Sequence, residues 1–250
     1  ITRALQQGAS TIINIMYAYA LSCAGSLFAA MGRDRLAGEY NSRRTTILKA
    51  IQELCWDAEK GMYREGPECC QFTQHAQSWA VLNGLVEGEA ARAVLTNAIE
   101  DKACLKCSFS TAYEWFRALE KAEMYGAMRD CLNDWISLLE LDCTTCPETP
   151  RGSRSECHAW SALPMYEMVR TMAGVVPEGI GWEHVRIQPN TMDLEDLQGK
   201  AATPKGDISF RYEKADGVWH YSVELPEGME ATFVYPDGSQ VRLNGGKVQI

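Results

Sequence analysis

The sequence contains no recognisable cofactor-binding motif and no strongly basic segment. No stretch matches the phosphate-binding P-loop or the G-x-G-x-x-G pattern of dinucleotide-binding proteins. The formal net charge is −9 and the isoelectric point is about 5.1, so no basic stripe is present to release counterions from the phosphates of a nucleic acid. These absences predict a protein that needs no cofactor, binds no nucleic acid and acts on a neutral ligand.

The sequence also lacks a segment with the basic flank, apolar centre and cleavage site of a secretory signal peptide. Its most apolar run, residues 12–30, is interrupted by polar or small residues, so we expect a closely packed core helix and no membrane span. The interruptions, at helical spacing, are Asn14, Ser22, Gly25 and Ser26. The chain opens on Ile1 with no initiator methionine, which favours a fragment of a longer protein.

Cysteine is absent after Cys157, and the ten cysteines are scattered through the part before it. This distribution is unlike the dense disulfide framework of a small secreted domain. We expect reduced, mostly buried thiols, which slightly favours a cytoplasmic location. Two C-x-x-C pairs leave open a zinc site with four thiolate ligands, although only their spacing supports it. The pairs are Cys104/Cys107 and Cys143/Cys146.

The first two thirds of the chain show helical periodicity, with the segments in pairs. Short loops between long helices imply antiparallel hairpins. Within one segment, Phe116 and Leu119 lie at helical spacing and are expected in the core. The paired segments are residues 10–31 and 33–56, 74–85 and 89–99, and 111–122 and 126–139, and a further helix is expected over 158–172.

After Gly174 the pattern changes to short alternating segments separated by turn signals, which predicts a small antiparallel β-sandwich. We expect no catalytic role for its histidines, His184 and His220. The fold class is therefore mainly α with an appended all-β domain, divided into residues 1–176 and 177–250. The strands are expected at residues 185–188, 208–212, 219–225 and 231–234, and the turns at Asp216-Gly217, Glu227-Gly228 and Asp237-Gly238.

The most informative stretch runs from Thr144 to Pro164. It reads T-T-C-P-E-T, then a short polar loop, then E-C-H-A-W-S-A-L-P. It places a carboxylate, Glu148, between two prolines beyond one helix, and an imidazole and an indole, His158 and Trp160, at the start of the next. A carboxylate, an imidazole and an indole at helix ends suit the binding and hydrolysis of a sugar, because glycoside hydrolysis needs carboxyl groups beside the scissile bond.

These motifs, followed by G-V-x-P-x-x-x-G-W-x-x-V-x-I-x-P from Gly174 to Pro189, resemble the C-terminal part of the bacterial α-L-rhamnosidases of glycoside hydrolase family 78. The resemblance covers roughly residues 10–235. It implies a partial (α/α)6 toroid of helix hairpins, with the active site at one end, followed by a β-sandwich. It also implies inverting hydrolysis of terminal α-L-rhamnosides in rhamnose-containing glycans, with Glu148 as the general base.

The role of Glu148 has two local alternatives. A glutamate at a helix end is commonly a solvated cap or salt-bridge partner. Glu156 is a second candidate, but a carboxylate at a helix start is favoured by the helix dipole without any function. The motif around Glu148 favours it as the base.

The resemblance assigns binding of the rhamnose ring to His158, although a half-buried histidine bonded within the helix packing is the alternative. Trp160 is a candidate for stacking on a sugar face, with core packing at least as well supported. His75 follows the polar Gln74 and precedes Gln77 in a helix start. Either these three residues form a hydrogen-bonded wall of the cavity, or the histidine is a structural residue whose hydrogen bonds are satisfied within the fold.

The segment S-F-S-T-A-Y-E-W-F-R-A-L also matches the family, and Thr111 and Tyr113 are its residues most expected to face substrate. The chain departs from the family in two ways. The general acid and most rhamnose-gripping residues of the family lie upstream of the matched region, so the chain alone is expected to be inactive. Family members usually have glycine immediately before the T-T dipeptide or one residue earlier, whereas here Leu141-Asp142-Cys143 precedes Thr144.

Two other functions stay open. The chain is alternatively part of another toroid glycosidase, since the fold does not fix the substrate, or a noncatalytic module that binds carbohydrate or protein. A partial barrel would also expose apolar hairpin faces, so we expect association of copies through them.

Overall fold

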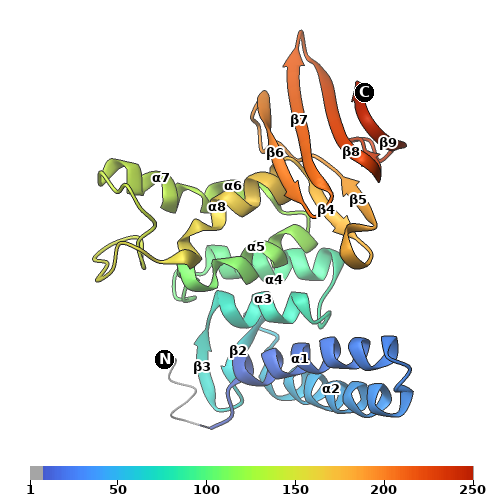
Figure 1. Cartoon of the computed structure of the whole chain (residues 1–250). Coiled ribbons are helices and arrows are strands. Elements are labelled where there is room, and N and C mark those ends of the chain that lie inside the picture. The colour runs from blue at the N-terminus through green and yellow to red at the C-terminus, as the bar shows by residue number, and fades with distance from the viewer. Residues whose placement is uncertain (1–7, 250) are drawn as a thin grey trace. The chain divides into compact units, whose positions relative to one another are not determined.

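The computed structural model describes residues 8–249. The chain forms two compact units, Ile1–Ser161 and Ala162–Ile250. The change from helices to strands comes at Val175, near the domain boundary that the sequence predicts after residue 176. That boundary stays a prediction. Helices dominate the first unit and strands the second (Figure 1).

The first unit opens with two long helices, α1 (Thr11–Ala30) and α2 (Asp34–Cys55), side by side (Figure 1). The hydroxyl of Ser10 caps α1 by accepting the N–H of Ile13 at 3.4 Å. A Cβ at Gly25 would lie 2.8 Å from the Asn41 side chain on α2. The predicted close packing through small residues is therefore confirmed at Gly25.

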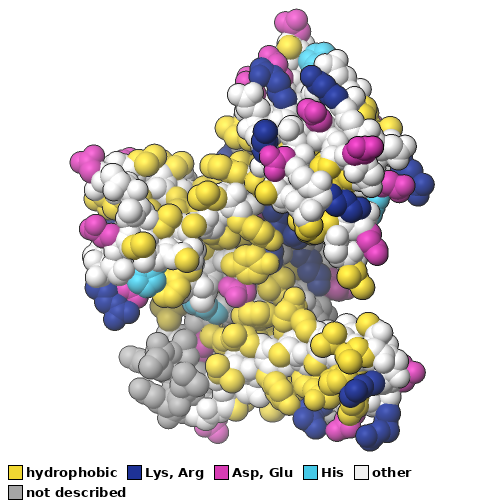
Figure 2. All heavy atoms as spheres, in the orientation of Figure 1, with side chains coloured by type: hydrophobic (Ala, Val, Ile, Leu, Met, Phe, Trp, Pro, Cys, Tyr) yellow, Lys and Arg dark blue, Asp and Glu magenta, His cyan; other side chains and the backbone are white. Residues whose placement is uncertain are grey.

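One stripe of α1, including Ile15 and Leu21, is buried. The opposite side exposes large apolar side chains, and Figure 2 shows hydrophobic side chains gathered over this hairpin. The exposed set is Ile13, Met16, Tyr17, Tyr19, Leu27 and Met31. By length and composition alone α1 could cross a membrane, a property that it shares with core helices of soluble proteins, and 22% of its most apolar window is buried. The prediction of a core helix therefore holds for one face only.

A small antiparallel sheet follows α2 and was not predicted from the sequence. Its strands are β1 (Trp56–Asp57), β2 (Met62–Gly66) and β3 (Cys69–Phe72). They are too short to show the alternation of apolar and polar residues from which strands are inferred. The chain leaves β3 directly into α3 (Gln74–Leu82), whose first turn is capped by the hydroxyl of Thr73.

The remaining helices of this unit follow the predicted pairing with one difference. They are α4 (Gly88–Glu100), α5 (Ala112–Lys121), α6 (Tyr125–Cys131) and α7 (Asn133–Glu140). The helix predicted over residues 126–139 is two helices that meet at Leu132. Phe116 and Leu119 on α5 are fully buried, which confirms them as core.

The single helix predicted over residues 158–172 is wrong. The segment is a 3-10 turn (Ala159–Ala162), a short α8 (Leu163–Glu167) and a π-helical turn (Met168–Met172). Pro164 lies in the first turn of α8, where its missing N–H is tolerated. Periodicity alone cannot distinguish these three helix types over so few residues.

The second unit is built on a six-stranded sheet in the order β4-β5-β8-β7-β6, with β9 also paired to β8. Most pairs are antiparallel, but β5 and β8 are parallel, so the prediction of a wholly antiparallel domain is wrong there. The strands are β4 (Val175–Glu178), β5 (His184–Ile187), β6 (Asp196–Thr203), β7 (Gly206–Ala215), β8 (Val218–Val234) and β9 (Gln240–Gln249).

Two predicted strands are one long strand, β8. The Glu227-Gly228 pair does not form a turn between strands but lies within β8, where the register against β9 shifts between Leu225 and Glu230. The first half of β8 pairs with β7 and the second half with β5. Strand breakers inside a continuous strand commonly mark such irregularities.

Gly174 is required where the helices end and the sheet begins. Its φ is +73°, and a Cβ there would lie 2.0 Å from the carbonyl oxygen of Gln188. The buried Tyr212 donates its hydroxyl proton to the Ala173 carbonyl at 2.9 Å, which fixes the same corner. The glycine of the G-V-x-P motif is therefore structural. The predicted fold class, helix hairpins followed by a β-sandwich, is confirmed.

Candidate active site

The candidate site lies on the loop between α7 and the 3-10 turn. This loop is closed by two backbone hydrogen bonds, from Glu148 N–H to the Ser155 carbonyl at 2.8 Å and from His158 N–H to the Cys146 carbonyl at 2.7 Å. The buried Ser161 adds a hydrogen bond from its hydroxyl to the Pro147 carbonyl at 2.6 Å. These bonds bring the T-T-C-P-E-T and C-H-A-W-S segments together.

The start of the loop explains the missing glycine. Asp142 follows the end of α7 with φ +53°, a left-handed conformation that glycine adopts most easily and aspartate tolerates. The N–H of Cys143 then bonds to the Leu138 carbonyl at 3.0 Å and closes the helix end. Asp142 therefore occupies a position suited to glycine.

The carboxylate of Glu148 is held by Arg154. The guanidinium donates from Nε to Oε2 and from Nη2 to Oε1, each at 2.8 Å. The Glu148 side chain is 14% exposed and that of Arg154 is 85% exposed. The hydrogen bonds from Arg154 lower the pKa of Glu148 below its ordinary value, so this carboxylate is ionised at neutral pH.

His158 and Trp160 lie beside Glu148. Their ring centroids are 4.3 Å apart, and the indole Nε1 of Trp160 donates to the Glu148 carbonyl at 3.1 Å. The imidazole Nδ1 of His158 lies 3.0 Å from the Ser155 hydroxyl, so Nε2 is the nitrogen left for a ligand. Trp160 is 43% exposed, so the alternative of core packing for this residue is wrong.

A second group contains His75 and Thr111. The hydroxyl of Thr111 lies 3.0 Å from Nε2 of His75, whereas Nδ1 is buried and has no hydrogen-bond partner among residues 8–249. Burial lowers the pKa of His75, which keeps it neutral. Tyr113 is 47% exposed, and the Arg117 guanidinium lies 5.6 Å from its ring centroid.

Gln77 has a structural role, and the cavity-wall interpretation is wrong for it. The side chain is fully buried. Its Oε1 accepts the Tyr63 N–H at 2.7 Å, and its Nε2 donates to the carbonyls of Tyr63 and Thr73 at 2.8 and 3.0 Å. Gln77 therefore joins α3 to β2. Gln74, in contrast, lines a pocket.

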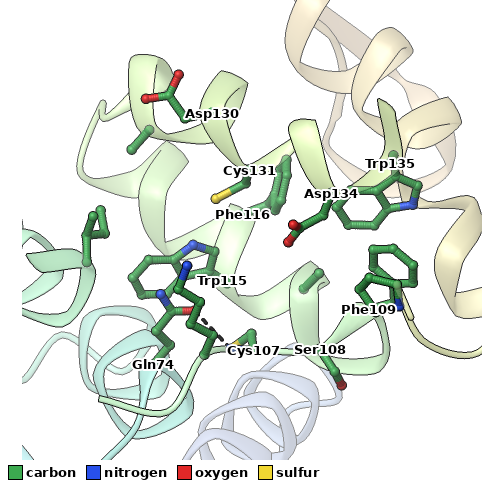
Figure 3. Close-up of a pocket in the computed structure, with 15 residues that line it drawn as sticks. Gln74, Cys107, Ser108, Phe109, Trp115, Phe116, Asp130, Cys131, Asp134 and Trp135 are labelled. Atoms are coloured by element: carbon green, nitrogen blue, oxygen red, sulfur yellow. Dashed lines mark hydrogen bonds between the residues drawn. The ribbon is translucent and has the colours of Figure 1, made fainter. Parts of the chain in front are cut away.

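That pocket has a volume of about 220 Å³ and is shown in Figure 3. Trp115 lies on one side of it, Trp135 packs against Phe109 on the other, and Asp134 points between them. Pro150 brings the loop of Glu148 to the same pocket. Aromatic faces with a few polar groups suit a small neutral ligand. The lining includes Gln74, Lys106, Cys107, Ser108, Phe109, Trp115, Asp130, Cys131, Asp134, Trp135 and Pro150.

Sequence reasoning did not single out Asp130, Asp134 or Trp135. The signal present was the pair of aspartates four residues apart, but such pairs are usually solvated. Within the described part of the chain, no hydrogen bond joins the His75 and Thr111 pair to the group around Glu148. Glu156 is exposed and its carboxylate has no hydrogen bond or ion pair among residues 8–249.

The zinc interpretation of the C-x-x-C pairs is not supported. No group of three or more potential ligands close enough to hold a metal occurs among the described residues. Burial raises the pKa of Cys104 to about 11 and that of Cys107 to about 12, so both are thiols at neutral pH. All ten cysteines are free, but only Cys55, Cys69 and Cys104 are fully buried.

Comparison with known proteins finds similarity to rhamnosidases. Residues 174–249 match the family model of the bacterial alpha-L-rhamnosidase C-terminal domain. The chain also superposes over 96% of its length, with a TM-score of 0.85 and 27% identity, on a GH78 family rhamnosidase of Bacillus sp. GL1. The chain resembles the C-terminal part of GH78 α-L-rhamnosidases. The resemblance predicted from the motifs, and with it the likeness to glycosidases, is confirmed.

Two further rhamnosidase structures share the fold at lower identity. The α-L-rhamnosidase of Aspergillus terreus matches 93% of the chain with a TM-score of 0.79 and 17% identity. That of Streptomyces avermitilis, solved in complex with L-rhamnose, matches 94% with a TM-score of 0.66 and 17% identity. The chain spans only 27%, 29% and 26% of the Bacillus, Aspergillus and Streptomyces proteins. No curated protein sequence matches it.

Proposed function

We propose that the chain is the C-terminal part of an α-L-rhamnosidase-like glycoside hydrolase, which hydrolyses terminal α-L-rhamnosides with inversion and uses Glu148 as the general base. The observation that carries the proposal is the grouping of an ionised Glu148 with His158 and Trp160 on one loop. The likeness of the whole chain to rhamnosidases supports it.

The charge state of Glu148 suits a base and not an acid. In an inverting glycosidase one carboxylic acid protonates the leaving oxygen, while a second carboxylate takes a proton from the attacking water. A general acid must carry a proton near neutral pH, which requires a raised pKa. Arg154 lowers the pKa of Glu148, so the ionised residue suits the role of the base. We assign the general acid to a segment upstream of the chain.

The neighbouring side chains offer contacts to a rhamnose ring. The Nδ1 of His158 is occupied by Ser155, so Nε2 can donate to or accept from a sugar hydroxyl. The exposed Trp160 offers an aromatic face for the apolar side of the ring. Substrate contacts of His75, Thr111 and Tyr113 are also part of the proposal.

The test is Glu148→Gln in a polypeptide that carries this chain together with the segment encoded upstream of it. Loss of a general base lowers kcat by about 10²- to 10⁴-fold, measured as rhamnose release from p-nitrophenyl α-L-rhamnoside. Rhamnose binding by calorimetry is retained, because glutamine preserves the shape. Glu156→Gln is the matched control and keeps its activity.

Two results contradict the proposal. Unchanged turnover by Glu148→Gln removes it as the base, which is the behaviour of a noncatalytic module. Rhamnose release by the 250-residue chain alone shows that no upstream acid is needed.

The exposed apolar face of α1 supports association of copies through the hairpin faces, which stays a prediction.

A further inference from the structure

Three consecutive residues, taken together, contact Glu148 and His158. The N–H of Glu148 donates to the Ser153 hydroxyl at 3.0 Å and to the Ser155 carbonyl at 2.8 Å. The Arg154 guanidinium holds the carboxylate. The Ser155 hydroxyl lies 3.0 Å from Nδ1 of His158. The backbone and side chain of Glu148 and the ring of His158 are thus all fixed by one tripeptide.

We propose that Ser153, Arg154 and Ser155 form a positioning strap that sets Glu148 and His158 relative to each other. Arg154 is the positioning residue for the carboxylate, and Ser155 is the positioning residue for the imidazole. The inference rests on the proposed function, because it concerns the same site. It adds residues that the rhamnosidase-like motifs around Glu148 and His158 do not include.

The ion pair leaves Glu148 able to act as a base. A carboxylate has two oxygens with about four acceptor positions in total, and the guanidinium of Arg154 uses one on each oxygen. Each oxygen therefore keeps an acceptor position for a water molecule. Arg154 orients the carboxylate plane through two parallel hydrogen bonds, which a lysine at this position cannot do.

The serine on the other side of the strap orients the imidazole. The Ser155 hydroxyl already accepts the N–H of Cys157 at 3.4 Å, which restricts its rotation. Its contact with Nδ1 fixes the ring plane of His158 and directs Nε2 away from the loop. The hydrogen bond of a second nitrogen commonly decides which imidazole nitrogen is available.

The first experiment measures Glu148 directly, by carbon-detected NMR titration of glutamate carboxyls in the 250-residue chain. The charged and titratable groups that act on Glu148 are Arg154 and His158. Arg154→Gln is expected to raise the pKa of Glu148 toward that of an ordinary glutamate. The control is Arg151→Gln, an exposed arginine of the same loop, which leaves it unchanged. Equal Glu148 pKa values in wild type and Arg154→Gln overturn the inference.

The second experiment measures turnover in the longer polypeptide. Arg154→Gln is expected to lower kcat by about tenfold to a hundredfold, since small displacements of a catalytic group have such effects. KM changes little, and the acid limb of the kcat/KM profile moves to higher pH. Arg154→Lys restores part of kcat, and Arg151→Gln behaves as wild type. A rise in kcat with Arg154→Gln would mean that the arginine blocks the base and overturns the strap.

Ser155→Ala tests the other end of the strap. It is expected to raise KM several-fold and to change the nitrogen chemical shifts of His158, whereas Ser155→Thr restores both. Unchanged shifts and KM overturn the assignment of Ser155. Failure of the proposed function gives a different result. In that case Glu148→Gln retains turnover, while Arg154→Gln still raises the pKa of Glu148 in the NMR titration. If Glu148→Gln abolishes turnover and Arg154→Gln has no effect, only the strap fails.

Discussion

Substitution of the buried Gln77 tests how much its hydrogen bonds stabilise the helical unit. Gln77→Met keeps a similar side-chain volume but removes all three hydrogen bonds to the backbone of Tyr63 and Thr73. A buried hydrogen bond contributes about 0.5–1.5 kcal/mol net. The loss of three therefore lowers the free energy of unfolding by about 2–4 kcal/mol. For a protein of this size that corresponds to a fall in Tm of roughly 5–15 °C.

The assay is urea denaturation followed by far-ultraviolet circular dichroism, with a thermal melt of the same samples. Gln71→Met is the matched control, because Gln71 is half-buried on β3 and its buried Oε1 has no hydrogen-bond partner in the described part of the chain. We expect the control to stay within about 0.5 kcal/mol of wild type. If Gln77→Met also stays within that range, the amide does not join α3 to β2 in the way described.

Two further predictions concern stability. Asp142→Gly is expected to raise the free energy of unfolding by up to about 1 kcal/mol, because glycine adopts the left-handed conformation at the end of α7 without strain; a decrease in the urea midpoint would contradict this. For His75, burial lowers the pKa in the folded state, so the unfolded chain binds the proton first as pH falls below about 6.5. Wild type should therefore lose more stability than His75→Gln between neutral pH and pH 5, as measured by urea midpoints; parallel losses would contradict it.

The helical spacing of apolar residues in the sequence correctly predicted core residues on the helices. On α5 the spacing of Phe116 and Leu119 identifies two core residues, but Arg117 and Ala118 between them are buried as well. Periodicity was uninformative for β2 and β3, since five and four residues show no period. The break at Leu132 and the π turn after Glu167 depend on small backbone adjustments that the same apolar pattern accommodates.

The candidate site was also predicted from the sequence only in part. The residue types at Glu148, His158 and Trp160 were identified from their motif. The partner of Glu148 was not, because Arg154 lies on an irregular loop and reaches the carboxylate only when the backbone bond from Glu148 to Ser155 closes that loop. Likewise, no local pattern indicates that Gln77 bonds to Tyr63 fourteen positions before it.

The pairing of β8 with different strands along its length has a consequence for how the β unit unfolds. Its first half belongs to the ladder with β7 and its second half to the ladder with β5, while β9 runs along both. Neither half of β8 can separate from the sheet without exposing backbone N–H and C=O groups of β9, which pairs with both halves. We therefore expect the unit to unfold as one cooperative body, so slow amide hydrogen exchange in β8 would report the unfolding of the whole unit.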